Sequence, residues 1–429
     1  MSTIHEMHVQ AELALAAYAN LTFGISGQNY IAALQQQGEG MSPTQAAAFA
    51  ERWTVVDQYA GGEVIEYYDE FGQLQQAWNP SGLSVTLFEE VGTGRQVVAV
   101  RGTQDVNDLV TDVVDIGLLG TPKYQTQYRD LATKVQSWLD TGQLQTGFTV
   151  AGHSLGGFLA TGLAIEYAEQ VVGTYLYNAP GLGNVIDSES IAEQVWRALS
   201  PTGGYSPSIV ATIHNIVSPS DPVSPVGIAV SPRLVIEIET GNPIHNHSIV
   251  TLTDALAVHA LLAKMDSTIT LQSVGGILKA SSAVSSNSLE SVVAAVGKLF
   301  DKSYSSVETT REDLYAHLAE LQIAIAGKTL TVVSLINMTA GELKAIASEP
   351  SMVATRYALK ELNPFAVLGA DYGRFALDLV NEATGQGDLS TQWIADRAKL
   401  LERYLAINTA DKVADPNGYH RVDNADETR

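Results

Sequence analysis

The 429-residue sequence contains no cysteine. Disulfide bonds and thiolate-ligated zinc sites are therefore excluded. Long hydrophobic runs are also missing, because no stretch reaches the ~20 uninterrupted apolar residues that cross a bilayer. The most apolar helical run, residues 249–263, is too short and contains Asp254 and His259. We therefore expect a soluble protein with no stable membrane insertion.

Basic residues are scarce: 24 Lys and Arg stand against 47 Asp and Glu, which gives a formal net charge of −23. A field of this sign repels phosphate backbones and anionic membranes. We therefore expect no nucleic-acid partner. High acidity also keeps proteins in solution, so the charge alone identifies no function.

The first 20 residues lack a basic n-region, and Glu6 and Glu12 interrupt any apolar h-region. We therefore expect no Sec signal peptide. The protein then either stays in the cytoplasm or leaves the cell by a route that does not read the N-terminus.

Residues 83–265 alternate between strand patterns and helix patterns. Predicted strands cover residues 83–89, 96–100, 147–151, 172–177 and 208–217, and predicted helices cover residues 107–114, 125–139, 155–169 and 248–265. This alternation is typical of an α/β fold with a mostly parallel central sheet and helices on both faces.

The flanking regions have a different texture, and the length allows two domains. Residues 1–60 are expected to form a helical lead-in, so that the first domain covers residues 1–265. Residues 266–429 are expected to form a mainly helical segment. A Ser-rich stretch at residues 281–288 is interpreted as a linker or mobile loop.

The strongest motif is Gly-His-Ser-Leu-Gly-Gly at residues 152–157, which fits G-x-S-x-G. An apolar strand leads into it and a helix leads out, which is the setting of the nucleophile elbow of α/β hydrolases. Small flanking residues leave room for the cramped turn, and the helix N-terminus favours a developing oxyanion. We therefore predict that Ser154 is a nucleophile; the alternative is a chance glycine-rich turn.

A serine nucleophile needs a base, and the base needs an acid that fixes its tautomer. In α/β hydrolases the acid and then the histidine follow the serine along the chain. Asp221, just after the strand that ends at residue 217, is the favoured acid, with Asp187 as competitor and an ordinary Asp-Pro turn as alternative. His247 is favoured as base over His245.

Other histidines fit the base less well. His259 lies inside a predicted helix, and His214 precedes the acid. His153 is interpreted as a structural residue of the elbow or a wall of the site. The oxyanion hole needs two backbone N–H groups. Leu155, directly after the nucleophile, and Thr103, after the strand at residues 96–100, are the predicted donors.

Together these residues resemble the class 3 lipase family. The resemblance rests on Arg101-Gly102-Thr103 with Asp108 or Asp112 after it, on the complete GHSLGG motif, on the turn at residues 178–184, on Asp221-Pro222-Val223 and on the late His247. Gly181 and Leu109 depart from the arginine and tryptophan usual in that family. The match covers residues 83–265.

The resemblance implies an α/β-hydrolase fold and hydrolysis of carboxylic esters, acylglycerols foremost, at a lipid–water interface. Phospholipase A1 or polyester hydrolase activity with the same triad is an alternative, and a non-catalytic interaction module is another. No cofactor or metal is required. Residues 113–119 are candidates for a lid or acyl-pocket wall, with helix packing as the alternative.

Residues 266–429 resemble, more loosely, a helical segment beside lipase domains in large bacterial proteins with calcium-binding repeats. That resemblance implies type I secretion, which needs no N-terminal signal peptide. The acyl chain length, the head group and the oligomeric state are not indicated by the sequence.

Overall fold

The computed structural model describes residues 3–36, 40–68, 73–102, 122–181, 211–227, 229–307 and 310–414. Its central element is a seven-stranded sheet in the order β1-β2-β3-β4-β5-β6-β7. The strands are β1 (Trp53–Tyr68), β2 (Leu74–Glu90), β3 (Gln96–Val100), β4 (Phe148–His153), β5 (Val171–Tyr177), β6 (Ile213–Val217) and β7 (Arg233–Val235).

The first three strands pair antiparallel, and β3 to β7 pair parallel. The predicted fold class is therefore confirmed. All of β3 and β4 is buried, as expected for nearly continuous apolar strands covered on both faces. The helices around the sheet are α1 (Thr3–Ala16), α2 (Gly27–Gln35), α3 (Pro43–Arg52), α5 (Pro122–Asp140), α6 (Leu155–Glu166) and α8 (Pro243–His247).

Aromatic and branched side chains join α5 and α6 to the sheet. Tyr128 and Trp138 of α5 and Phe158 of α6 share one buried cluster with Val98 and Val150 of the central strands. Gly162 of α6 allows the close approach, because a Cβ there would lie 2.3 Å from the Tyr128 ring. This core fixes β4 and α6, the two elements that flank the predicted nucleophile.

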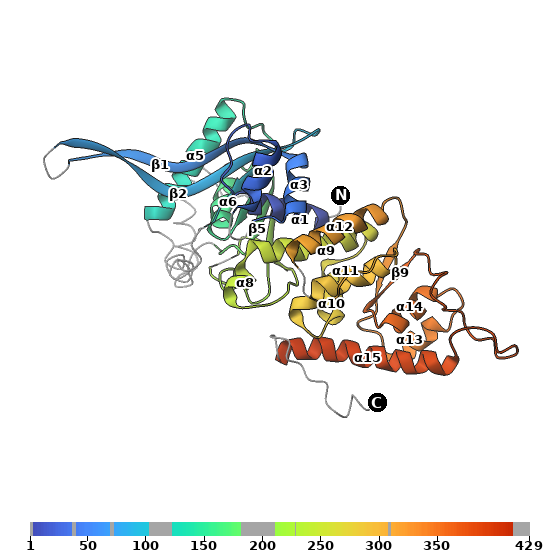
Figure 1. The fold of residues 1–429 in the computed structure, drawn as a ribbon. Helices are drawn as coiled ribbons and strands as arrows, with labels where there is room; N and C mark the ends of the chain where they lie inside the picture. Colours follow the sequence, from blue (N-terminus) through green and yellow to red (C-terminus); the bar gives the residue numbers. More distant parts are fainter. Residues whose placement is uncertain are drawn as a thin grey trace. The chain divides into compact units, whose positions relative to one another are not determined.

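The β1–β2 hairpin differs from the prediction. The helical lead-in expected through residue 60 ends at Arg52, and β1 begins at Trp53. Only Val85–Glu89 of β2 pair with β3, so the rest of the hairpin continues as a two-stranded ribbon (Figure 1). Register shifts near Val55 and Ala60 interrupt the period-2 pattern, which hides β1 in the sequence.

The described chain divides into two compact units. One contains Met7–Val235 and Pro243–Thr253, and the other contains Met1–Glu6, Ile236–Asn242 and Asp254–Arg429. The boundary falls inside α9 (Ile249–Met265) and not at residue 265.

The second unit is mainly helical. Its further elements are α10 (Leu271–Ser281), a 3₁₀ turn (Ser285–Asn287), α11 (Ser288–Lys298), α12 (Arg311–Ala324), β8 (Thr331–Ser334), α13 (Ala340–Ala347), α14 (Val353–Glu361), β9 (Phe365–Leu368) and α15 (Thr391–Ala414). The Ser-rich stretch is not an exposed linker. It is a packed connection between α10 and α11, in which Ser282, Ser285 and Ser288 are buried.

Membrane-crossing helices were expected to be absent. Within the described ranges, no helix combines the length and apolarity that a membrane span requires.

Candidate active site

Ser154 lies in a sharp turn between β4 and α6. Its backbone has φ 55° and ψ −128°, a conformation that L-residues rarely adopt. It costs free energy and persists only where the surrounding structure imposes it. Strained residues of this kind concentrate at functional sites. The turn therefore has the strand–turn–helix geometry of a nucleophile elbow.

The glycines beside the elbow are required by space. A Cβ on Gly152 would lie 2.4 Å from the carbonyl oxygen of Gly156, and one on Gly156 would lie 2.2 Å from that of Val100. Both contacts are far below van der Waals distance and involve backbone atoms. The motif thus lets β3, β4 and α6 come together at Ser154.

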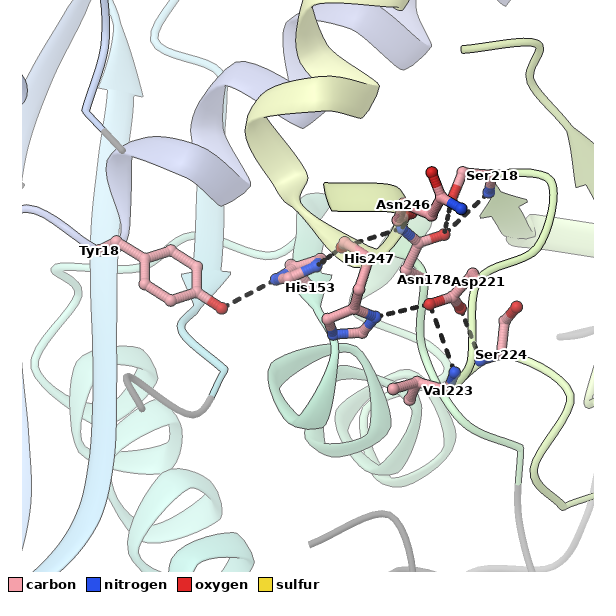
Figure 2. Close-up of polar contacts among 9 residues, drawn as sticks. All are labelled: Tyr18, His153, Asn178, Ser218, Asp221, Val223, Ser224, Asn246 and His247. Carbon is pink, nitrogen blue, oxygen red and sulfur yellow. Dashed lines mark hydrogen bonds and ion pairs between the residues drawn. The ribbon is translucent and has the colours of Figure 1, made fainter. Parts of the chain in front are cut away.

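Asp221 and His247 meet next to His153, the residue before Ser154 (Figure 2). Asp221 follows β6, His247 ends the short helix α8, and the distance from Nδ1 of His247 to Oδ1 of Asp221 is 2.7 Å. Both side chains are buried. The carboxylate can only accept while ionised, so Nδ1 of His247 carries a proton, and in a neutral ring that leaves Nε2 as the acceptor.

Two buried atoms of this site have no hydrogen-bond partner among the described residues. Oγ of Ser154 and Nε2 of His247 are both buried, and neither bonds to any of the described residues. Buried polar atoms are nearly always paired, so an unpaired one calls for an explanation such as a catalytic role. A hydroxyl that can donate and an imidazole nitrogen that can accept are the two groups of a serine–histidine proton transfer.

The environment keeps Asp221 ionised. Burial by itself raises the pKa of this carboxyl, but the hydrogen bond and charge of His247 and the hydrogen bonds of Ser224 outweigh burial and lower it below the usual range. The Ser224 N–H donates to Oδ2 at 2.6 Å and the Val223 N–H donates to Oδ1 at 3.3 Å. An ionised carboxylate at Nδ1 is what a catalytic histidine requires.

Asn178 fixes the backbone that carries the histidine. It lies after β5 in a left-handed conformation, with φ 45°. Its Nδ2 donates to the carbonyl oxygens of Asn246 and His247 at 3.1 and 3.0 Å, and its Oδ1 accepts from the Ser218 N–H at 2.8 Å (Figure 2). One buried amide therefore ties the loop after β6 to α8.

Tyr18 and His153 form a second connection to His247. The Tyr18 hydroxyl lies 2.8 Å from Nδ1 of His153, and Nε2 of His153 lies 2.8 Å from the carbonyl oxygen of His247 (Figure 2). The His153 and His247 rings are 4.8 Å apart. Tyr18 was not predicted from the sequence, because it belongs to no spaced motif, and Asn178 was named there only as the start of the turn at residues 178–184.

The alternative bases lie elsewhere. His245 is exposed on α8, His214 stacks on Tyr175 with ring centroids 4.6 Å apart, and His259 is buried in α9 beside the Ala255 carbonyl oxygen. Of the histidines weighed as the base, His247 is the one that the structure brings to Asp221.

Of the two predicted oxyanion donors, Leu155 lies among the described residues. Leu155 is the first residue of α6, directly after Ser154, where helical N–H groups have no partner within the helix. Thr103 and the competing acid Asp187 lie outside the described residues, as does the proposed lid at residues 113–119. Among the residues that are described, no group of three or more His, Asp or Glu could hold a metal ion.

Comparison with known proteins gives a family match and a structural similarity. Residues 66–201 match the model of a phospholipase-like family, the Tle-like phospholipase domain. No curated protein matches the chain. The crystal structure of the Lip2 lipase from Yarrowia lipolytica is similar over 56% of this chain and 81% of that chain, with 15% identity and a TM-score of 0.31.

The family match includes Ser154 and Leu155 and ends before Asp221 and His247. It supports the prediction that this part of the chain is a lipase-like domain. The class 3 assignment, the type I secretion route and the catalytic role of each residue stay predictions.

Proposed function

We propose that this protein hydrolyses carboxylic esters of lipids with Ser154 as nucleophile, His247 as base and Asp221 as the acid that orients it. The observation that carries the proposal is that one protein has both a strained serine at the elbow and a buried hydrogen bond of 2.7 Å between Asp221 and His247. The Ser154 hydroxyl and His247 Nε2, which bond to none of the described residues, are the groups that must exchange a proton.

The proposed reaction has two stages. Ser154 Oγ attacks the acyl carbon while Nε2 of His247 takes its proton, and the N–H groups of Leu155 and Thr103 stabilise the oxyanion. His247 then gives the proton to the leaving alcohol. Water, activated by the same nitrogen, hydrolyses the acyl-enzyme and releases the fatty acid.

Phospholipids are the second candidate substrate beside acylglycerols. The similarity of residues 66–201 to a phospholipase-like domain favours them. The net charge of −23 disfavours anionic surfaces, so we expect zwitterionic phosphatidylcholine to be a better substrate than phosphatidylglycerol. A release of lysophospholipid and fatty acid would identify phospholipase A activity.

The test is a comparison of Ser154→Ala with the wild type on p-nitrophenyl butyrate, trioctanoin and phosphatidylcholine vesicles. We expect a loss of about 10⁴-fold or more in turnover and no labelling by a fluorophosphonate probe. Ser231→Ala is the matched control, since its buried hydroxyl also bonds to none of the described residues. A Ser154→Ala protein that keeps a tenth of wild-type turnover would overturn the proposal.

A further inference from the structure

The contacts of Tyr18 and His153 have a defined direction. A carbonyl oxygen only accepts, so Nε2 of His153 must donate to the His247 carbonyl oxygen. Burial, and next the nearby His247, lower the pKa of His153 to about 3, so the ring is neutral at ordinary pH. A neutral ring protonated on Nε2 has a bare Nδ1, which accepts from the Tyr18 hydroxyl.

The same hydroxyl has a second contact on the other side. The Gly102 N–H donates to the Tyr18 oxygen at 3.2 Å. The hydrogen bonds therefore run in one sense, from Gly102 to Tyr18 to His153 to the His247 carbonyl. In this order Gly102 only donates and the His247 carbonyl only accepts. Tyr18 and His153 each accept one hydrogen bond and donate another.

Gly102 lies against the nucleophile. A Cβ added there would be 2.6 Å from both the His153 carbonyl oxygen and the Tyr18 hydroxyl, and 3.2 Å from Cβ of Ser154. Thr103, a predicted oxyanion donor, is the next residue in the sequence. A shift of Gly102 would therefore move the backbone that lies beside Ser154.

Tyr18 is itself held on the sheet. Gln58 of β1 accepts from the Leu21 N–H at 2.7 Å and donates to the Ala19 carbonyl oxygen at 2.9 Å. A β5 side chain anchors the preceding helix, since the Tyr177 hydroxyl donates to the Met7 carbonyl oxygen at 2.6 Å. The tyrosine is thus presented by an anchored segment.

We propose that Tyr18 and His153 are positioning residues: their hydrogen-bond relay holds Gly102 and the His247 backbone in register on either side of Ser154. This inference rests on the proposed ester hydrolysis at Ser154. The relay touches no reacting atom, so its loss should loosen transition-state geometry and leave ground-state binding nearly unchanged.

The first test is kinetic. Removal of a whole oxyanion donor costs about 10²–10³ in kcat, whereas the Tyr18 contacts given above reach the site indirectly, through Gly102 and His153. We therefore expect Tyr18→Phe to lower kcat about 10-fold with KM changed less than about twofold. The affinity of an alkyl boronic acid, which mimics the tetrahedral intermediate, should fall by the same factor as kcat/KM.

Tyr30→Phe is the matched control. The Tyr30 hydroxyl is buried in α2 and bonds to none of the described residues, so its removal should leave kcat and boronate affinity unchanged. A Tyr18→Phe enzyme with wild-type kcat and boronate affinity would overturn the relay. A rise in KM at unchanged kcat would also overturn it, because that pattern reports lost ground-state binding.

A second test needs no variant and no substrate. ¹⁵N NMR of the nine labelled histidines, with His153 assigned, should show it neutral from pH 5 to 8, with Nε2 protonated and Nδ1 accepting a hydrogen bond. The opposite tautomer would overturn the relay. If the wild type hydrolyses no ester, the proposed function fails while this measurement still decides the relay.

Discussion

His245 and His247 lie two residues apart on α8, yet only one of them has the surroundings of a catalytic base. His247 is buried and bonds to Asp221 at 2.7 Å, whereas His245 is exposed. Residues of a triad act as a unit. We therefore expect His247→Ala to reduce kcat/KM about as much as Ser154→Ala, and His245→Ala to reduce it only a few-fold, each measured per fluorophosphonate-titrated site or per folded protein.

His245→Ala also serves as the control for disturbance of α8. A reversed ranking, with His245→Ala the more damaging change, would show that His245 is the base and that the Asp221–His247 contact has a structural role.

Glu239 is a second residue whose surroundings lead us to a prediction, here about the pH dependence of stability. Burial, and next the charge of Glu290, raise the pKa of Glu239 to about 8, although N–H groups of Leu289 and Ser288 bond to it. The folded protein then binds more protons than the unfolded chain between about pH 4.5 and pH 8, so stability falls as pH rises through that window.

We expect Glu239→Gln to raise the melting temperature at pH 8.5 by about 2 °C or more, the shift that 1 kcal/mol produces in a domain of this size. The effect should be smaller at pH 5, where the carboxyl is already neutral in the folded state. The amide oxygen can still accept the Leu289 N–H bond. Scanning calorimetry at both pH values measures the difference.

Glu237→Gln is the control, since that carboxylate pairs with Lys279 at 3.4 Å and its loss removes an ion pair. An equal shift for Glu239→Gln at pH 5 and pH 8.5 would contradict the buried-carboxyl explanation.

Some residues of the site could be predicted from the sequence and others could not. Ser154 has a motif with strict flanks, and Asp221 and His247 follow in the chain order that the elbow implies. Tyr18 lies 135 residues from its partner His153, and its role depends on a backbone N–H and a ring nitrogen. Such contacts leave no spacing in the sequence.

At the scale of elements, the elbow requires close approach of β3 and α6. Gly156→Ala would place a Cβ 2.2 Å from the Val100 carbonyl oxygen, and neither strand nor helix can move without opening the core. Overpacking of this kind costs about 1–3 kcal/mol or more. We expect Gly156→Ala to lower the melting temperature by several degrees and to abolish turnover, as measured by calorimetry and ester hydrolysis.

Gly173→Ala on β5 is the matched control. Its Cβ would meet the Tyr175 ring at 3.4 Å, an ordinary contact, so stability and turnover should change little. A Gly156→Ala enzyme as stable and active as Gly173→Ala would contradict the steric account of the elbow.

Sequence periodicity predicted well those elements whose apolar residues follow a single strand or helix pattern from end to end. The predicted strands at residues 96–100 and 172–177 and the helix at residues 125–139 agree closely with β3, β5 and α5. The β1–β2 ribbon was missed because Gly61, Gly62 and Pro80 indicate turns, and register shifts break its alternation. Propensity marks such residues as breakers, but cross-strand pairing overrides them.

At the scale of the whole chain, a cut at residue 265 does not separate two units. The helical unit takes in Ile236–Asn242 and most of α9, beginning at Asp254. The Asp254 carboxylate is bound by Arg311 Nε and Nη2 at 2.7 and 2.8 Å and by the Tyr315 hydroxyl at 2.9 Å. Both partners follow residue 265, so a chain that ends there retains the acid without them.

We therefore expect deletion of residues 266–429 to lower the melting temperature and solubility more than it lowers turnover per probe-titrated site. The Asp254 side chain is largely buried and the Arg311 side chain is part-buried, so the loss of this ion pair costs up to about 3–5 kcal/mol, the cost of breaking a fully buried pair. The apolar face of α9, including Val258, Leu261 and Leu262, also loses its cover. Arg311→Gln in the full chain is the control that isolates the ion pair.

A truncated chain as stable as the full one would show that the helical unit is an independent spacer. One that folds normally but has lost turnover would show that the helical unit contributes to the active site, since Ser154, Asp221 and His247 would all still be present.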